Sequence, residues 1–126
     1  RDPFSVHTAL HYRRPIDAEL LACAAQHFLG THDFRAFMAS GSDIADTTRT
    51  VRSVSVTREG SVVRLRIAAD GFLYNMVRIF VGTMLSVNEG KLTPDDIPAV
   101  IDSRDRKNAG ITVPAHGLYL NRVVFR

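Results

Sequence analysis

A tyrosine and an arginine placed four residues apart form the pair in this chain that is best suited to chemistry. Tyr74 and Arg78 follow an alternating apolar segment at 63–69 and an Asp-Gly turn. Beyond the turn, apolar residues recur with a period of about 3.6, which predicts a helix that continues to about residue 88. Side chains four residues apart lie on one helix face, so we expect both to flank the buried stripe. An arginine there can reach a carboxylate or phosphate while its stem stays packed, or it can simply extend into solvent.

Histidines and a further arginine are weaker candidates for a site. His32, which precedes an aspartate, His116 and Arg52 are the polar residues concerned. Arg52 shares an expected strand face with two valines, where a cation needs an anion partner unless it lies beyond the sheet edge. Both interpretations of Arg52 stay open. His7 and His11 share the outer face of the first expected strand, but no third ligand lies near them in the sequence, so we expect solvent-facing histidines and no metal site.

Length and composition describe one ordinary globular domain and exclude several functional classes. The 126 residues are 45% hydrophobic and 23% charged, which suits a single domain over 1–126. The net charge of +3 leans towards an acidic partner such as nucleic acid. One cysteine, Cys23, excludes an internal disulfide framework and fits a reducing cytoplasm. No apolar run approaches the roughly 18 residues of a membrane span. No glycine-rich phosphate loop, nucleophile elbow, zinc-protease motif or cysteine cluster occurs.

The elements that must position the tyrosine and the arginine follow from turn and cap signals. The first half of the chain is expected to form a strand at 5–12, a helix capped by Asp17 and ended by Gly30, a helical turn at 31–37 and a loop at 38–50. A hairpin follows, with one strand through Val54 and the other at 63–69. After it we expect the helix of Arg78, a helix that begins at Thr93, a charged connector at 104–110 and a strand at 117–125. This order predicts an α+β, ferredoxin-like (split βαβ) domain: an antiparallel sheet with its helices on one face. Phe34 and Phe37 are expected in the core, and the other sheet face is left for a partner.

Several segments, in order along the chain, resemble the C-terminal half of the tRNA pseudouridine synthase A (TruA) family. The matching segments are 30–37, 50–52, 70–78 with Gly82, 105–106 with 109–110, and 114–120. The resemblance implies isomerisation of uridine to pseudouridine in the tRNA anticodon arm, just 3′ of the anticodon, without metal or organic cofactor. It also implies a cytoplasmic homodimer whose partner is tRNA. The fold would be one half of a pseudouridine synthase catalytic fold.

The resemblance also assigns roles to individual residues. It implies that Arg78 pairs with the catalytic aspartate, that Leu118 or Leu120 forms the apolar wall of the uracil pocket, and that Tyr74 borders the cleft. We expect contacts to RNA from Arg52, His32, Arg35, Arg49, Arg106 and His116.

The catalytic aspartate of the family has no counterpart in this chain. The family carries it in an Arg-Thr-Asp motif, whereas the Arg49-Thr50 pair here is followed by Val51. The chain also begins with arginine instead of methionine, so we expect a fragment whose N-terminal half carries the aspartate and a stacking tyrosine. Alone, the chain is expected to be inactive. Two other interpretations remain: a free-standing RNA-binding module, and a structural or dimerisation domain that binds no tRNA.

Overall fold

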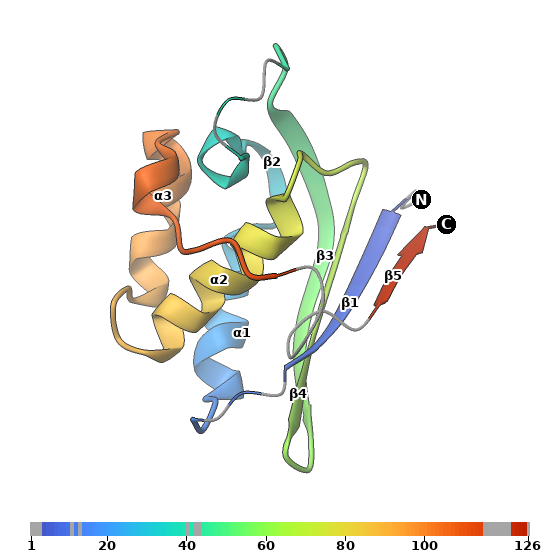
Figure 1. The fold of residues 1–126 in the computed structure, drawn as a ribbon, viewed down its shortest axis with the longest axis vertical. Coiled ribbons are helices and arrows are strands. Elements are labelled where there is room, and N and C mark those ends of the chain that lie inside the picture. The colour runs from blue at the N-terminus through green and yellow to red at the C-terminus, as the bar shows by residue number, and fades with distance from the viewer. Residues whose placement is uncertain are drawn as a thin grey trace.

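The computed structural model describes residues 4–10, 12, 14–39, 41, 44–114 and 122–125. These residues form one antiparallel sheet covered on one face by helices (Figure 1). The strands are β1 (Phe4–Leu10), β2 (Gly30–Asp33), β3 (Thr48–Glu59), β4 (Val62–Ala69) and β5 (Arg122–Phe125). The helices are α1 (Ala18–Gln26), α2 (Met76–Asn88) and α3 (Ile97–Ser103), with short 3-10 helices at Arg35–Phe37, Pro94–Asp96 and Arg106–Asn108.

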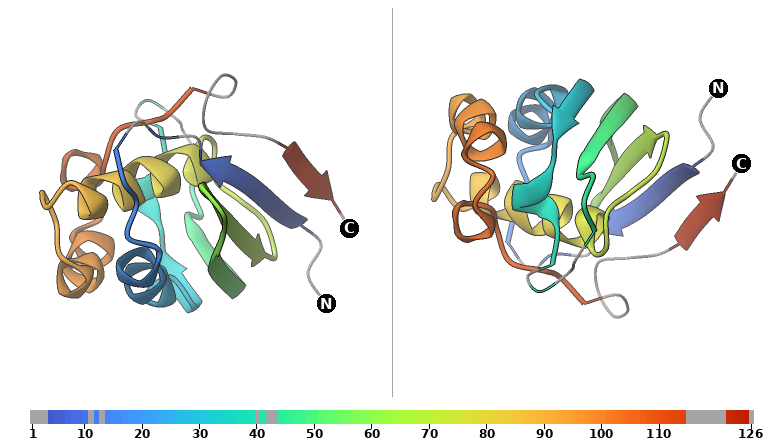
Figure 2. Two further views of the ribbon diagram at one scale, coloured as in Figure 1. Left: turned by 90° about the horizontal axis from the view of Figure 1, so that it is seen from below. Right: turned by 90° about the horizontal axis from the view of Figure 1, so that it is seen from above.

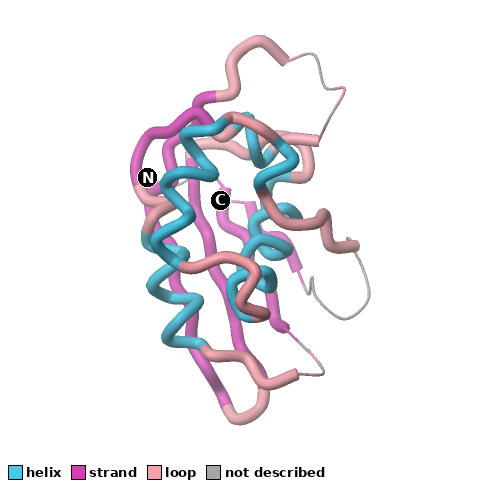
Figure 3. Tube along the Cα trace, turned by 90° about the vertical axis from the view of Figure 1, so that its left-hand side faces the viewer, coloured by secondary structure: helices cyan, strands magenta, loops and turns pink. Residues whose placement is uncertain are grey.

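The strand order confirms the ferredoxin-like prediction. In the described part of the chain the sheet runs β2-β3-β4-β1-β5, and every pairing is antiparallel. Without β2, the order β3-β4-β1-β5 with α1 and α2 as crossovers is the split βαβ arrangement. Figures 2 and 3 show α1, α2 and α3 together on the same side of the strands. None of the helices in the described ranges is long and apolar enough to cross a membrane.

Four phenylalanines join the helical layer to the loops beside it. Phe28, Phe34 and Phe37 are completely buried and Phe80 is almost so. The ring centroid of Phe28 lies 4.7 Å from that of Phe80 and 5.0 Å from that of Phe37, both edge-on, and it stacks on Phe34 at 5.9 Å. The edge-on and offset arrangements are favourable for aromatic pairs. The prediction that Phe34 and Phe37 fill the core is confirmed.

The predicted helix caps at Asp17 and Thr93 and the predicted hairpin turn at Gly60 are confirmed. Asp17 caps α1 by accepting a hydrogen bond from the Leu20 amide at 3.1 Å. Gly60 turns the β3–β4 hairpin with a φ of 60°. The expected start of a helix at Thr93 is a capping box, in which the Thr93 amide donates to Asp96 Oδ2 at 2.8 Å.

The segment around Gly30 differs from its prediction. Helix α1 ends at Gln26, and Gly30, with a φ of 100°, opens strand β2 instead of ending the helix. Residues 31–33, expected in a helical turn, pair with β3, with Thr31 opposite Thr50. Their polar composition has no strand periodicity, because an edge strand with exposed side chains is held by backbone pairing more than by burial. Only residues 35–37 are helical.

A β-bulge at Arg52 changes the face of the strand on which this residue lies. Val51 pairs with Ala69 and Ser53 with Ala68, so Arg52 is the extra residue on β3. The extra residue reverses the alternation, and as a result Val51 is 2% exposed on the core side while Arg52 is exposed. The expectation that Arg52 shares the core-facing side of Val54 is therefore wrong.

Candidate active-site arginine and its supporting segment

The turn before α2 is fixed to strand β3 by Asp70. The Asp70 amide donates to the Thr50 carbonyl at 3.1 Å, and Asp70 Oδ1 accepts from the Thr50 amide at 3.0 Å. These two bonds hold residue 70 at the end of β4, directly beside the sheet. They determine where the chain leaves the sheet to begin α2.

Helix α2 begins later than the sequence indicates, which separates Tyr74 from Arg78. Asn75 has a left-handed φ of 63°, and Met76 is the first helical residue. Tyr74 therefore lies in the preceding turn, where its carbonyl accepts from the Ala39 amide at 3.2 Å and its side chain is 69% exposed. The expectation that the two side chains share a helix flank is wrong, because the left-handed residue breaks the helical spacing.

The guanidinium of Arg78 is half-buried and is held on two sides by neutral oxygens. Nε donates to the Val113 carbonyl at 2.6 Å, and Nη1 donates to Asn75 Oδ1 at 2.9 Å. The Val113 amide donates back to the Arg78 carbonyl at 3.3 Å. Within the described ranges, no hydrogen bond involves Nη2 of Arg78 and no carboxylate forms an ion pair with it. The side chain is thus oriented while one edge of its fork is still able to bind an anion.

The acceptor of Arg78 belongs to residues 110–113, here called the strap, which crosses α2 (Figure 1, the orange-red segment before the grey trace). The strap approaches the helix backbone to backbone: a Cβ built on Gly82 would lie 1.8 Å from the Ile111 carbonyl oxygen. A Cβ on Gly110 would lie 2.5 Å from the Gly82 backbone. Glycine is required at both positions because any side chain would separate the strap from the helix.

Two side chains, those of Thr83 and Arg106, hold the strap by hydrogen bonds. Thr83 Oγ1 on α2 accepts from the Gly110 amide at 2.9 Å and donates to the Ile79 carbonyl at 2.8 Å. Arg106, which opens a 3-10 turn capped by Asp105, donates from Nη1 to the Gly110 carbonyl at 2.7 Å. Its Nη2 donates to Thr112 Oγ1 at 2.9 Å. The sequence gives no direct signal for Asn75 or Thr83, although an isolated glycine in a helical pattern, such as Gly82, often marks a close approach.

The residues expected to contact RNA are spread over several elements. Arg35 and Arg52 are exposed. Arg49 Nη1 donates to the carbonyls of Asp46 and Thr48, at 2.9 and 2.7 Å. His32 Nε2 lies 2.7 Å from the Leu29 carbonyl oxygen. No observation tests these residues as RNA contacts, and they stay predictions. His116, Leu118 and Leu120 lie outside the described residues.

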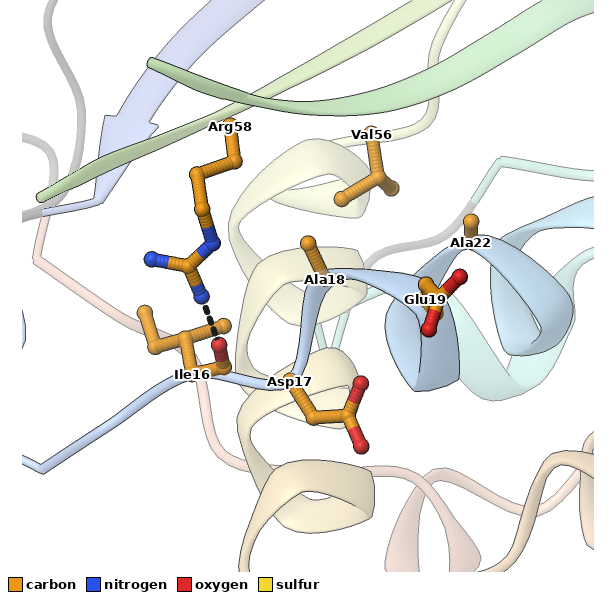
Figure 4. Close-up of a pocket in the computed structure, with 7 residues that line it drawn as sticks. All are labelled: Ile16, Asp17, Ala18, Glu19, Ala22, Val56 and Arg58. Atoms are coloured by element: carbon orange, nitrogen blue, oxygen red, sulfur yellow. Dashed lines mark hydrogen bonds between the residues drawn. The ribbon is translucent and has the colours of Figure 1, made fainter. Parts of the chain in front are cut away.

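Two surface hollows of the described part are lined by residues other than Arg78. Figure 4 shows one between α1 and β3, where Arg58 reaches across to donate to the Ile16 carbonyl and where Asp17, Glu19 and Val56 complete the lining. Another lies between β2 and α3, beside His32, Asp33 and Arg104. Groups of three or more metal-ligating side chains are absent from the residues that the structure describes.

The fold is a ferredoxin-like α+β domain that holds the half-buried guanidinium of Arg78 in a fixed direction. Comparison with known proteins then identifies its family: the family model described as tRNA pseudouridine synthase matches residues 24–126. The chain belongs to the tRNA pseudouridine synthase family.

Curated relatives agree with the family match and also show how much of the protein this chain represents. It is 51% identical over 119 residues to tRNA pseudouridine synthase A of Acetivibrio thermocellus, which covers 94% of this chain and 49% of the relative. It is 41% identical over 124 residues to tRNA pseudouridine synthase A of Bacillus velezensis, covering 98% and 50%. With tRNA pseudouridine synthase A 2 of Clostridium perfringens the identity is 45% over 115 residues, covering 91% and 47%. The chain spans about half the length of the curated relatives it matches.

Proposed function

We propose that this chain is the arginine-bearing half of a tRNA pseudouridine synthase. Together with a second, N-terminal half that carries the catalytic aspartate, it isomerises uridine to pseudouridine in the anticodon arm of tRNA. The observation that carries the proposal is the state of Arg78: half-buried, oriented by Val113 and Asn75, and without a carboxylate partner among the described residues. The family match and the half-length coverage of the relatives support it.

In this proposal Arg78 orients the aspartate and keeps it ionised. A guanidinium beside a carboxylate favours the charged form, and its planar fork fixes the direction in which the carboxylate oxygens point. The target base must leave the stack before the aspartate can reach it, at a cost of a few kcal/mol. Leu118 or Leu120 forms the apolar wall that receives the uracil, and the exposed Tyr74 borders the cleft.

The remaining expectations of the sequence belong to the same proposal. Exposed cations, including Arg35 and Arg52, meet tRNA phosphates and position the anticodon arm. The reaction needs only side chains of the two halves and involves no metal or organic cofactor. The assembled enzyme is a cytoplasmic homodimer.

The test compares Arg78 variants of the full-length enzyme, meaning this chain joined to its N-terminal half. We expect Arg78→Ala to lower kcat by at least about 10²-fold, because it removes a preorganised charged donor from the reacting carboxylate. The Kd for tRNA should change little, since Arg78 does not carry phosphate binding. Arg78→Lys should also be slow, because an ammonium lacks the planar fork. Pseudouridine is measured by tritium release from labelled tRNA.

Lys91→Ala is the matched control, because it removes one exposed positive charge at the far end of α2. The isolated 126-residue chain should show no turnover, and adding the N-terminal half should restore it. Normal turnover by Arg78→Ala, or by the isolated chain, contradicts the proposal. Selective binding of the anticodon arm by the isolated chain, with no turnover by the full-length protein, would instead indicate an RNA-binding module.

A further inference from the structure

The structure points to a different role for Arg106 from the RNA contact that its charge suggests. We propose that Arg106 is a positioning residue: it holds the strap, residues 110–113, against α2 and through Val113 fixes the direction of the Arg78 guanidinium. The inference rests on the proposed function, because it concerns the geometry of the arginine that would meet the catalytic aspartate.

The donors of Arg106 are directed into the protein. Nη1 and Nη2 bind the Gly110 carbonyl at 2.7 Å and Thr112 Oγ1 at 2.9 Å, and the residue is half-buried. The two acceptors lie two residues apart on the strap, so one planar group braces both ends of a three-residue stretch. Hydrogen bonds from a charged donor are about twice as strong as neutral ones. A phosphate would have to compete with both bonds, or bind the edges of the fork that they leave.

The strap needs this brace because few other contacts of its own hold it in the described structure. Ile111 is 68% exposed and so contributes little burial, and Gly110 has no side chain. Glycine also gives the chain more conformational freedom to lose than any other residue. Two other contacts anchor the strap. At its first residue the Gly110 amide donates to Thr83, and at its last residue the Val113 side chain is buried.

A displaced strap would release Arg78, since the two are bonded in both directions. Val113 accepts from Arg78 Nε at 2.6 Å and its amide donates to the Arg78 carbonyl at 3.3 Å. Without the first bond, only Asn75 Oδ1 orients the guanidinium, and rotation about the side-chain torsions becomes possible. A misplacement of about 1 Å in a reacting group can cost about 10²-fold in rate. Arg106 therefore acts on the chemistry without touching substrate.

The experiment measures kinetics and salt-dependent tRNA binding for Arg106→Ala, Arg106→Lys and the control Lys91→Ala in the full-length enzyme. A residue that contacts a phosphate contributes about one unit to the slope of log Kd against log salt, whereas a positioning residue contributes none. We expect Arg106→Ala to lower kcat by about 10-fold to 10²-fold, with KM and the salt slope unchanged. Arg106→Lys should restore part of kcat, because one ammonium can still donate to the Gly110 carbonyl.

A second readout does not depend on turnover. The Nε–H signal of Arg78 in ¹⁵N-labelled protein, assigned by its loss in Arg78→Lys, should exchange faster in Arg106→Ala and at the wild-type rate in Lys91→Ala. If the wild-type enzyme makes no pseudouridine, the proposed function fails, while this signal still decides whether Arg106 positions Arg78.

Two results would overturn the inference. One is a raised KM and a salt slope lower by about one at unchanged kcat, which would identify a phosphate contact. The other is an Arg78 Nε–H signal that is the same with and without Arg106. If Arg106→Ala does not fold, Thr112→Val replaces it, since this variant removes one acceptor and keeps the charge. It should lower kcat severalfold at a constant salt slope, and an unchanged kcat counts against the inference.

Discussion

Replacing Gly82 by alanine should detach the strap from α2 without changing any charge. A Cβ at this position would lie 1.8 Å from the Ile111 carbonyl oxygen and 2.8 Å from its carbon, where 3.4 Å or more is ordinary contact. The obstructing atoms are backbone, so no side-chain rotation can relieve the overlap. The strap would have to move by roughly 1.5 Å, because close-packed interiors leave no empty space to absorb the methyl group.

A movement of this size breaks the hydrogen bonds that join the strap to α2. The Gly110 amide to Thr83 bond and the two bonds between Val113 and Arg78, at 2.6–3.3 Å, would all exceed hydrogen-bonding distance. Each neutral bond contributes about 1 kcal/mol and the charged one about 1.5–3 kcal/mol. Alanine offsets about 1 kcal/mol of this by its better helix propensity. The net loss in the free energy of unfolding is therefore about 3 kcal/mol, with kcat falling as well.

Urea unfolding followed by circular dichroism measures the change, and Ser86→Ala, one turn along the same helix, is the control for helix propensity. The control should remain within about 0.5 kcal/mol of wild type. A Gly82→Ala protein that is as stable as the wild type, or more stable, would show that helix propensity outweighs the clash. It would thereby refute the argument that close approach of the strap fixes Arg78.

Two further substitutions test the core and the first helix by the same unfolding assay. Phe28→Ala should lower the free energy of unfolding by about 3–5 kcal/mol, because it removes the ring at the centre of the aromatic cluster. The control Leu29→Ala, at a side chain that is 38% exposed, should lower it far less. Equal losses would contradict the central role of Phe28. Asp17→Ala should cost about 1 kcal/mol by removing the cap of α1, and Asp17→Asn should restore most of it; failure of asparagine to do so would count against a capping role.

The sequence predicts those parts of the fold that depend on local signals. The cap at Asp17, the hairpin turn at Gly60 and the capping box at Thr93 each depend on residues close together in the chain, and all three are confirmed. Strand β2 could not be predicted in the same way. It forms because Gly30 and the next three residues pair with β3, a non-local contact that polar edge residues do not signal.

The candidate site is predictable in its composition and not in its geometry. The family resemblance identifies Arg78 as a site residue. The helical spacing wrongly places Tyr74 on the same helix face as Arg78, because periodicity gives no sign that Asn75 adopts a left-handed conformation. Similarly, Arg106 has the charge of an RNA contact, and only its distances to the strap show where its donors are directed. Sequence patterns thus identify a cation, while the direction of its donors depends on tertiary contacts.

In the proposed enzyme, the neutral partners of Arg78 leave its charge available for the catalytic aspartate of the N-terminal half. A carboxylate in the same place would orient the guanidinium but also neutralise it, and the pair would then have little attraction for a second aspartate. The Val113 carbonyl and the Asn75 amide oxygen restrict the direction of the side chain and leave its charge uncompensated. Partial burial weakens the competition from water for that charge. If Asn75 were replaced by aspartate, we would therefore expect tRNA binding to persist and the turnover of the full-length enzyme to fall, since an internal anion would compete with the catalytic one for Arg78.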